Sequence, residues 1–206
     1  MPQLNIGLCF LIALLLLSGC SQTLTRQTCV TLAPEVSYCL APINQQVLGS
    51  DRQTISAMQK ASINTQASQH ELLTQLELNQ QQLTLVGLAP LGQALFTLNY
   101  DGHNLISEQS QLLGEQFKAE YLLAIMQLIY WPDNSVNQYL QGATITRYQC
   151  DTALCRGVFF AKSNPNYQAD NQQALITIRY SDLTPWQAEV ELNIPAANFQ
   201  LNISPL

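Results

Sequence analysis

The sequence predicts an α+β protein that is mainly antiparallel β, folded as an open half-barrel whose concave side is closed by an apolar helix and a short second helix. Segments that alternate between apolar and polar residues, typical of half-buried strands, fill residues 72–109 and return after residue 143. Between them the period changes to that of a helix. A helix placed between two groups of strands fits one sheet that curls around it.

The composition supports one domain with a substantial core, which we expect over residues 51–206. Of the 206 residues 47% are hydrophobic and only 11% are charged, well below the usual fraction of about a quarter. The formal net charge is -6, and Lys and Arg do not cluster. This charge pattern argues against nucleic acid, another polyanion or an anionic lipid headgroup as the partner.

The first strands are expected to form a meander. The dipeptide Asp101-Gly102 is a strong hairpin signal between two of them. Residues 51–70 are rich in Gln and Ser and alternate only weakly, which predicts an edge strand. Clearer alternation predicts strands over residues 72–79, 82–88, 94–100 and 104–109.

The helical segment covers residues 114–132, with Glu115 and Glu120 toward its N-terminus and Pro132 ending it. From Tyr121 to Trp131 it is apolar on nearly every side, broken only by Gln127. Such a helix is either a membrane span or deeply buried, and this stretch is too short to span a bilayer, which needs about 20 residues. We therefore expect it to be covered on several sides.

A short second helix is expected over residues 132–142, with Asp133 or Asn134 near its cap and Gly142 closing it. The strand pattern then returns until the end of the chain. The expected strands cover residues 143–149, 156–162, 174–181, 187–194 and 198–203.

The N-terminus is expected to carry an export signal. Residues 6–17 form an apolar run of the length found in secretory signal peptides, although residues 1–7 contain no Lys or Arg. The run ends in Leu17-Ser18-Gly19-Cys20, which resembles a bacterial lipobox. Residues 1–19 would then be the lipoprotein signal peptide and Cys20 the lipidated first residue. The alternative is a plain secretory signal with a chance cysteine.

Residues 20–50 are expected to be the lipidated N-terminus and a tether, because they show little periodicity and contain Pro34, Pro42 and Gly49. Ser rather than Asp follows Cys20, and by resemblance to Gram-negative lipoproteins this favours the outer membrane, with the domain facing the periplasm.

Four cysteines remain besides Cys9 and Cys20, and an even number in an exported protein predicts two disulfides. Four cysteines allow three connectivities, which the sequence does not decide. We favour the two local pairs, Cys29 with Cys39 and Cys150 with Cys155. A zinc site is the alternative, but it lacks both C-x-x-C spacing and a nearby histidine.

The sequence contains no catalytic constellation that we recognise. The two histidines are His70, at the start of a strand, and His103, in the turn that follows Asp101-Gly102. No G-x-S-x-G, H-E-x-x-H, P-loop or G-x-G-x-x-G motif is present. We therefore expect neither an enzyme nor a cofactor or metal site. One alternative function remains a hydrolase whose activity depends on His70 or His103.

Three features together resemble the LolB family of outer-membrane lipoproteins. They are the lipobox, the stretch APLGQALFTLNYDGHNL (89–105) and the stretch YWPDNSVNQYLQG (130–142). The resemblance runs over about residues 70–195 and is closer still to an uncharacterised family of small LolB-like lipoproteins, some encoded beside aryl-polyene lipid genes. It implies a LolA/LolB-like open barrel with an apolar cavity for acyl chains. The four cysteines, the tether and the Gln-rich strand are not part of the LolB pattern.

The resemblance also implies the function. LolB accepts lipoproteins from a soluble periplasmic carrier and inserts them into the outer membrane, and the Leu of its Pro-Leu-Gly turn protrudes, a role that carries over to Leu91. The cavity would be lined by residues of two strands and the helix. These candidates are Phe96, Leu98, Tyr121, Leu122, Ile125, Met126, Ile129 and Trp131.

The expected function is therefore the binding and transfer of a lipidated or hydrophobic molecule, a lipoprotein or a glycolipid or aryl-polyene-type lipid, from a LolA-like carrier into the outer membrane. The alternative is a non-enzymatic scaffold lipoprotein of an envelope complex. A void of about 300 Å³ or more lined by apolar atoms favours transfer, and an interior filled by the helix favours the scaffold. For Leu91 the alternative to a protruding side chain is a turn leucine that folds back onto the core.

Overall fold

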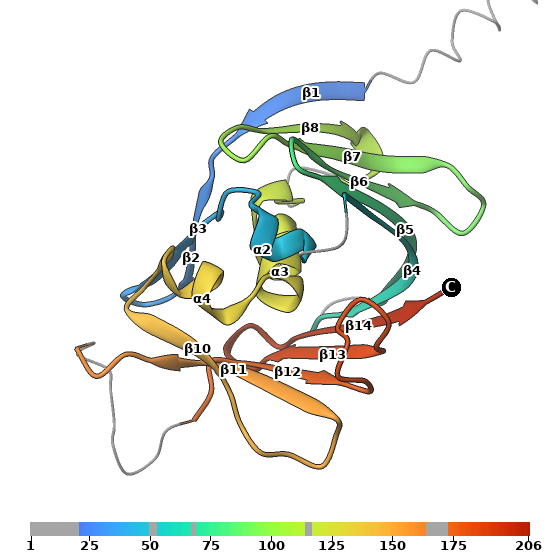
Figure 1. Cartoon of the computed structure of the whole chain (residues 1–206). Coiled ribbons are helices and arrows are strands. Elements are labelled where there is room, and N and C mark those ends of the chain that lie inside the picture. The colour runs from blue at the N-terminus through green and yellow to red at the C-terminus, as the bar shows by residue number, and fades with distance from the viewer. Residues whose placement is uncertain (1–20, 50–52, 67–68, 114–116, 164–172) are drawn as a thin grey trace, which may run out of the picture.

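A computed structural model describes residues 21–49, 53–66, 69–113, 117–163 and 173–206. Its main feature is one 11-stranded antiparallel sheet that curls around the helices without closing into a barrel (Figure 1). From edge to edge its strands are β1 (Ser21–Arg26), β8 (Leu105–Ser110), β7 (Ala94–Tyr100), β6 (Leu83–Leu88), β5 (Gln69–Asn79), β4 (Thr54–Asn64), β14 (Phe199–Pro205), β13 (Val190–Ile194), β12 (Ile176–Tyr180), β11 (Leu154–Phe160) and β10 (Ala143–Arg147).

A second, 3-stranded sheet lies where the large sheet stays open, between its edge strands β1 and β10 (Figure 1). It consists of β2 (Cys29–Ala33), β3 (Val36–Cys39) and β9 (Leu140–Gln141). Three helices lie on the concave side of the large sheet, namely α2 (Gln45–Leu48), α3 (Ala119–Tyr130) and α4 (Asp133–Asn137), and two 3-10 turns cover Gln111–Leu113 and Pro195–Ala197. The prediction of a mainly antiparallel, open α+β fold is confirmed.

The strand register defines two ends of the large sheet, which we name after two of their residues. The Leu91 end carries the β6–β7 turn, the β13–β14 turn and the start of β1, because Ser21 pairs with Ser110 at the end of β8. The Trp186 end carries the β5–β6 turn, the β7–β8 turn and the β12–β13 loop. Helix α3 begins after β8 at the Leu91 end and runs to the Trp186 end.

Helix α3 fills most of the concave side. Ten of its residues are buried, as its all-round apolar character predicts. It begins at Ala119, later than the predicted start at residue 114, and it stops where Trp131 takes an extended backbone ahead of Pro132. The short second helix also differs from expectation: its cap is Pro132, it ends at Asn137, and Gly142 follows the strand β9 instead of closing the helix.

The expected tether is wrong for residues 21–48, which form β1, β2, β3 and α2. Val30, Val36 and Tyr38 are buried in the same core as α3. These strands escape sequence analysis because they are short, are interrupted by an irregularity between Thr31 and Ala33, and bury few side chains each. The N-terminal segment is therefore part of the fold.

In the described part of the chain, no helix has both the length and the apolar character needed to cross a bilayer.

The expectation of an edge strand over residues 51–70 is also wrong, since β4 lies inside the sheet between β5 and β14. Its inward face carries the small residues Ala57 and Ala61 and the amide of Gln59, which is 1% exposed. Gln59 donates from Nε2 to the Tyr130 hydroxyl of α3 at 2.7 Å. A polar residue whose amide N–H is bonded to the central helix thus weakened the alternation that marks an interior strand.

Candidate functional site

Leu91 stands at the tip of the β6–β7 hairpin, and its side chain is 98% exposed. The Ala89 N–H donates to the Gln93 carbonyl and the Gly92 N–H to the Ala89 carbonyl, both at 2.8 Å. Gly92 has a φ of 82°, a conformation that glycine adopts without strain. The turn therefore holds Leu91 outward, and the alternative in which Leu91 folds back onto the core does not match the structure.

A ring of half-buried apolar side chains surrounds the concave mouth at the Leu91 end, and we call it the apolar rim. These side chains pack against the core on one side and remain partly open to solvent. At the Trp186 end the inward side chains at the strand ends, such as Leu83, Leu105 and Val190, are fully buried. Half-buried apolar side chains at the inward strand ends thus gather at the Leu91 end, while Leu183 and the partly buried Trp186 lie in the loop at the other end. The rim consists of Ile63, Leu72, Leu122, Phe160, Ile194 and Phe199.

Between α3 and the sheet, just inside the apolar rim, lies a small apolar cavity of about 20 Å³. Of the predicted lining residues, Phe96, Leu122 and Met126 contribute to it. The Phe96 ring lies over Gly87, where an added Cβ would come within 2.2 Å of it. The cavity has room for about one water molecule and not for an acyl chain. Helix α3 fills the interior in the described part of the chain.

The remaining predicted lining residues do not line this cavity. Leu98, Ile125 and Ile129 are buried in the core. Tyr121 is 36% exposed and its hydroxyl donates to the Thr31 carbonyl of β2 at 3.1 Å, so it faces the small sheet. Trp131 lines a different pocket at the other end of α3. The structure therefore gathers three of the eight candidates and distributes the other five.

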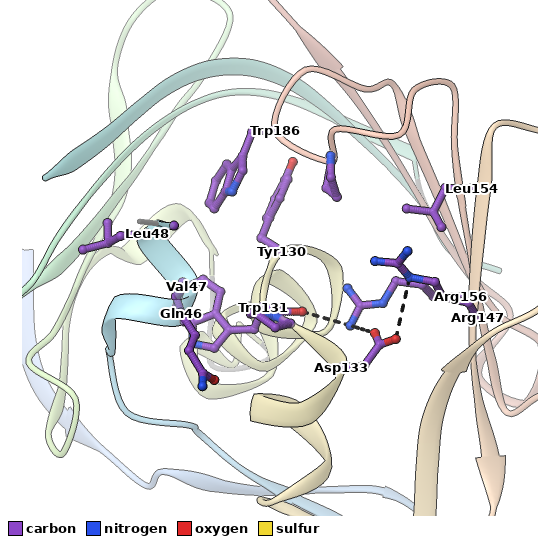
Figure 2. Close-up of a pocket in the computed structure, with 13 residues that line it drawn as sticks. Gln46, Val47, Leu48, Tyr130, Trp131, Asp133, Arg147, Leu154, Arg156 and Trp186 are labelled. Atoms are coloured by element: carbon purple, nitrogen blue, oxygen red, sulfur yellow. Dashed lines mark hydrogen bonds and ion pairs between the residues drawn. The ribbon is translucent and has the colours of Figure 1, made fainter. Parts of the chain in front are cut away.

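The second pocket opens at the Trp186 end and has a volume of about 430 Å³ (Figure 2). The rings of Tyr130 and Trp186 stack in its wall, with centroids 4.0 Å apart. The Asp133 carboxylate forms an ion pair with the Arg156 guanidinium at 2.8 Å and lies 3.8 Å from Nε of Arg147. This pocket is large but lined by charged and polar groups as well as apolar ones. We expected one acyl cavity that is both large and apolar. The structure instead has a large pocket with a mixed lining at the Trp186 end and a small apolar cavity near the rim.

Arg156 binds the C-terminal end of α3, a role that no pattern in the sequence indicates. The guanidinium is 3% exposed and donates to the carbonyls of Ile129 and Trp131, both at 2.9 Å. Figure 2 shows the bond to Trp131. The Tyr180 hydroxyl donates to the same Ile129 carbonyl at 2.7 Å, and burial raises the pKa of Tyr180 above its ordinary value. Carbonyls at the end of a helix have no partner within the helix, so these donors attach α3 to β11 and β12.

Residues 56–206 match a protein family described as a protein of unknown function, DUF3261. The chain belongs to the DUF3261 family. No curated protein matches the chain. The DUF3261 match includes Leu91, every residue of the apolar rim, and Arg156 with its partners. It begins after the segment that forms β1, β2, β3 and α2.

The remaining candidate residues of this DUF3261 protein are its cysteines and histidines, and the structure does not gather them into one site. The four cysteines form the disulfides Cys29–Cys39 and Cys150–Cys155, the two local pairs that we favoured. None of these four cysteines therefore has a free thiolate to bind zinc. His70 is exposed at the Leu91 end and His103 is exposed at the Trp186 end, so the fold does not bring them together. Among the described residues, no group of three or more His, Cys, Asp or Glu side chains is placed to hold a metal ion. Cys20 lies outside the described residues.

Proposed function

We propose that this protein is an outer-membrane lipoprotein that binds a lipidated or otherwise hydrophobic molecule and transfers it from a soluble, LolA-like periplasmic carrier into the outer membrane. Its sheet would then be a half-barrel of the LolA/LolB kind. The observation that carries the proposal is the 98% exposed Leu91 beside an apolar rim. A side chain of this kind gains about 1.5–3 kcal/mol when it enters an apolar phase.

An acyl chain would enter at the apolar rim by moving the first turns of α3. Two sets of hydrogen bonds hold the other part of the helix: Gln127 is bonded to the N-terminal segment, and Arg156 is bonded to the helix end. Leu122 and Met126 lie before these points and line the small cavity. Each methylene group that becomes buried contributes about 0.8 kcal/mol, which would offset the displacement of the helix. No covalent chemistry is required of the protein.

The test replaces Leu91 by Glu in the lipidated, full-length protein. The probe is a fluorescent palmitoylated peptide moving from donor to acceptor vesicles of phosphatidylethanolamine and phosphatidylglycerol. Losing about 1.5–3 kcal/mol of insertion energy corresponds to roughly 10- to 150-fold slower transfer. The free energy of unfolding should change by less than about 0.5 kcal/mol, because Leu91 has no core contacts to lose.

Leu183→Glu is the matched control, because Leu183 is 72% exposed and lies in the β12–β13 loop at the Trp186 end. It should transfer the probe as fast as the wild type. Wild-type transfer no faster than transfer without protein, or equal rates for Leu91→Glu and the wild type, would overturn the proposal.

A second candidate function is a non-enzymatic scaffold lipoprotein of an envelope complex. The observation that favours it is the filled interior, since the apolar cavity of about 20 Å³ falls far below the space that ligand pockets offer. Mass spectrometry of the lipidated protein crosslinked to its carrier separates the two functions. A co-purifying acyl-bearing molecule supports transfer, and a carrier complex without lipid supports the scaffold.

A further inference from the structure

We propose that β1 holds the lipidated N-terminus at the Leu91 end, so that the apolar rim and Leu91 face the surface of the bilayer. The inference rests on the lipidation of Cys20 in the proposed function and adds the orientation of the domain. A lipoprotein with a long tether can present any face to the membrane. In this protein the strand that follows the anchor belongs to the sheet.

The register of β1 places its first residue at the Leu91 end. Ser21 pairs with Ser110, the last residue of β8, and Arg26 pairs with Leu105 at the other end. Cys20 is bonded directly to Ser21, and consecutive Cα atoms are about 3.8 Å apart. The acyl chains on Cys20 would therefore start at the mouth that carries the apolar rim.

Leu91 extends beyond this anchor point along the strand direction. Because Phe96 pairs with Gln109, Leu95 lies beside Ser110, and the hairpin continues for four more residues to Leu91. At about 3.3 Å per residue the tip reaches roughly 10 Å past Ser21. Figure 1 shows β1 beginning on the same side as the β6–β7 tip, which projects further. The interfacial layer of one leaflet is about 5–8 Å thick, so an anchor at the membrane surface places Leu91 at the start of the acyl chains.

The two ends of the sheet differ in polarity in the sense that this orientation requires. At the Leu91 end the described turn and loop residues are 65–66, 89–93, 161–163 and 195–198, which include the cationic Lys162 but no carboxylate. At the Trp186 end the turns contain Gln80–Gln82, Asp101–Asn104 and Ser181–Asp182. Leu183 is the apolar exception there, and Asp182 precedes it directly. The apolar end can approach lipid while the acidic and amide-rich end remains in water.

A bilayer fits this surface better than a second copy or a carrier protein does. The anchor fixes the rim at the membrane before any partner arrives, and Leu91 is a single protruding side chain rather than a groove. A protein bound to the rim is therefore an alternative outcome of the test.

The experiment measures the distance of both ends from the membrane. Single cysteines carrying a fluorophore replace Gln93 and Ala197 at the Leu91 end and Gln81 at the Trp186 end, all of them exposed. The lipidated full-length protein is placed in phosphatidylethanolamine and phosphatidylglycerol vesicles with and without brominated acyl chains. We expect quenching at least fivefold stronger at positions 93 and 197 than at position 81. Equal quenching at the two ends, or none at position 197, overturns the proposal. Self-quenching between labelled copies in place of quenching by lipid also overturns it, because the rim would then bind a second copy of the protein.

A linker variant tests the role of β1 itself. Twelve Gly and Ser residues inserted after Ser21 give the anchor a reach of about 20 Å. With β1 intact, Leu91→Glu should leave the quenching pattern in place, whereas the linker together with Leu91→Glu should remove the difference between the ends. If Leu91→Glu alone removes the difference, β1 does not set the orientation.

A protein without lipid on Cys20 overturns both this inference and the proposed function. A lipidated protein that transfers the probe without the expected quenching overturns this inference alone.

Discussion

At the scale of single residues, Gln127 explains how an apolar helix is joined to a chain segment far away in sequence. Its Oε1 accepts from the Tyr38 hydroxyl at 2.7 Å and from the Ala41 N–H at 2.8 Å, and its Nε2 donates to the Ala41 carbonyl at 3.0 Å. The side chain is fully buried, and burial raises the pKa of Tyr38 above its ordinary value, so Tyr38 remains a donor. One polar residue in an apolar helix thus indicates a specific buried partner.

Replacing Gln127 by Ala should lower the free energy of unfolding by about 3 kcal/mol or more. The change leaves the Tyr38 hydroxyl and the Ala41 N–H without their acceptor, and each buried group left unsatisfied costs about 1–3 kcal/mol. Urea unfolding measures the effect. The matched control is Gln141→Ala, which removes an exposed glutamine and should change stability by less than about 0.5 kcal/mol. Equal stabilities of the two variants would show that this network does not hold the N-terminal segment.

A second residue prediction concerns pH. Asp101 accepts hydrogen bonds from the Asn104 side chain and from the N–H groups of Asn104 and His103, and these bonds lower the pKa of Asp101 from 3.8 to about 2. A lowered pKa in the folded state means that the carboxylate stabilises the fold above pH 3.8 and loses this effect as the pH falls toward 2. The stability difference between the wild type and Asp101→Asn should therefore shrink from pH 6 to pH 2.5 in urea unfolding. A difference that stays constant with pH would contradict this assignment.

At the scale of elements, the sequence predicts those strands and helices whose own residues alternate. Strands β6, β7 and β8, the turn at Asp101 and helix α3 follow from local pattern, since each buries one regular face. Strand β1 has the polar sequence Ser-Gln-Thr-Leu-Thr-Arg, and it joins the sheet by pairing with β8, which lies 79 to 89 residues further along the chain. The small size of the apolar cavity also escapes sequence analysis, because it depends on how completely the side chains of α3 fill the curved sheet.

The β2–β3 hairpin yields a prediction of its own. Cys29 and Cys39 close a loop with a sequence separation of 10, and Cys150 and Cys155 one of 5. Loop entropy assigns about 3 kcal/mol to the first bridge and about 2 kcal/mol to the second. We expect the paired change Cys29→Ala with Cys39→Ala to destabilise the protein more than Cys150→Ala with Cys155→Ala does, as measured by urea unfolding without reductant. The opposite order would mean that native contacts outweigh loop entropy at these sites.

At the scale of the whole molecule, the large sheet stays open and the N-terminal segment occupies the opening. Strand β1 extends one edge, the small sheet lies between the two edges, and α2 lies on the concave side (Figure 1). The DUF3261 match starts at residue 56, after all of these elements. A protein limited to residues 51–206, the boundary that the sequence pattern suggests, would leave one side of α3 uncovered.

We therefore expect a chain shortened to residues 51–206 to lack cooperative unfolding. The deleted segment removes six apolar side chains that are at most 5% exposed, namely Val30, Val36, Tyr38, Leu40, Val47 and Leu48. At about 1.5–3 kcal/mol each, as an upper estimate, their burial amounts to roughly 10 kcal/mol, which is comparable to the whole stability of a typical domain. Near-UV circular dichroism during urea titration measures the outcome. Adding an oxidised peptide of residues 21–49 should restore the transition if the segment completes the core, because the register of β1 on β8 and the Gln127 hydrogen bonds need no covalent link to form. A shortened chain that unfolds cooperatively without the peptide would show instead that the DUF3261 region forms its core alone, and that the N-terminal segment serves only to position the anchor.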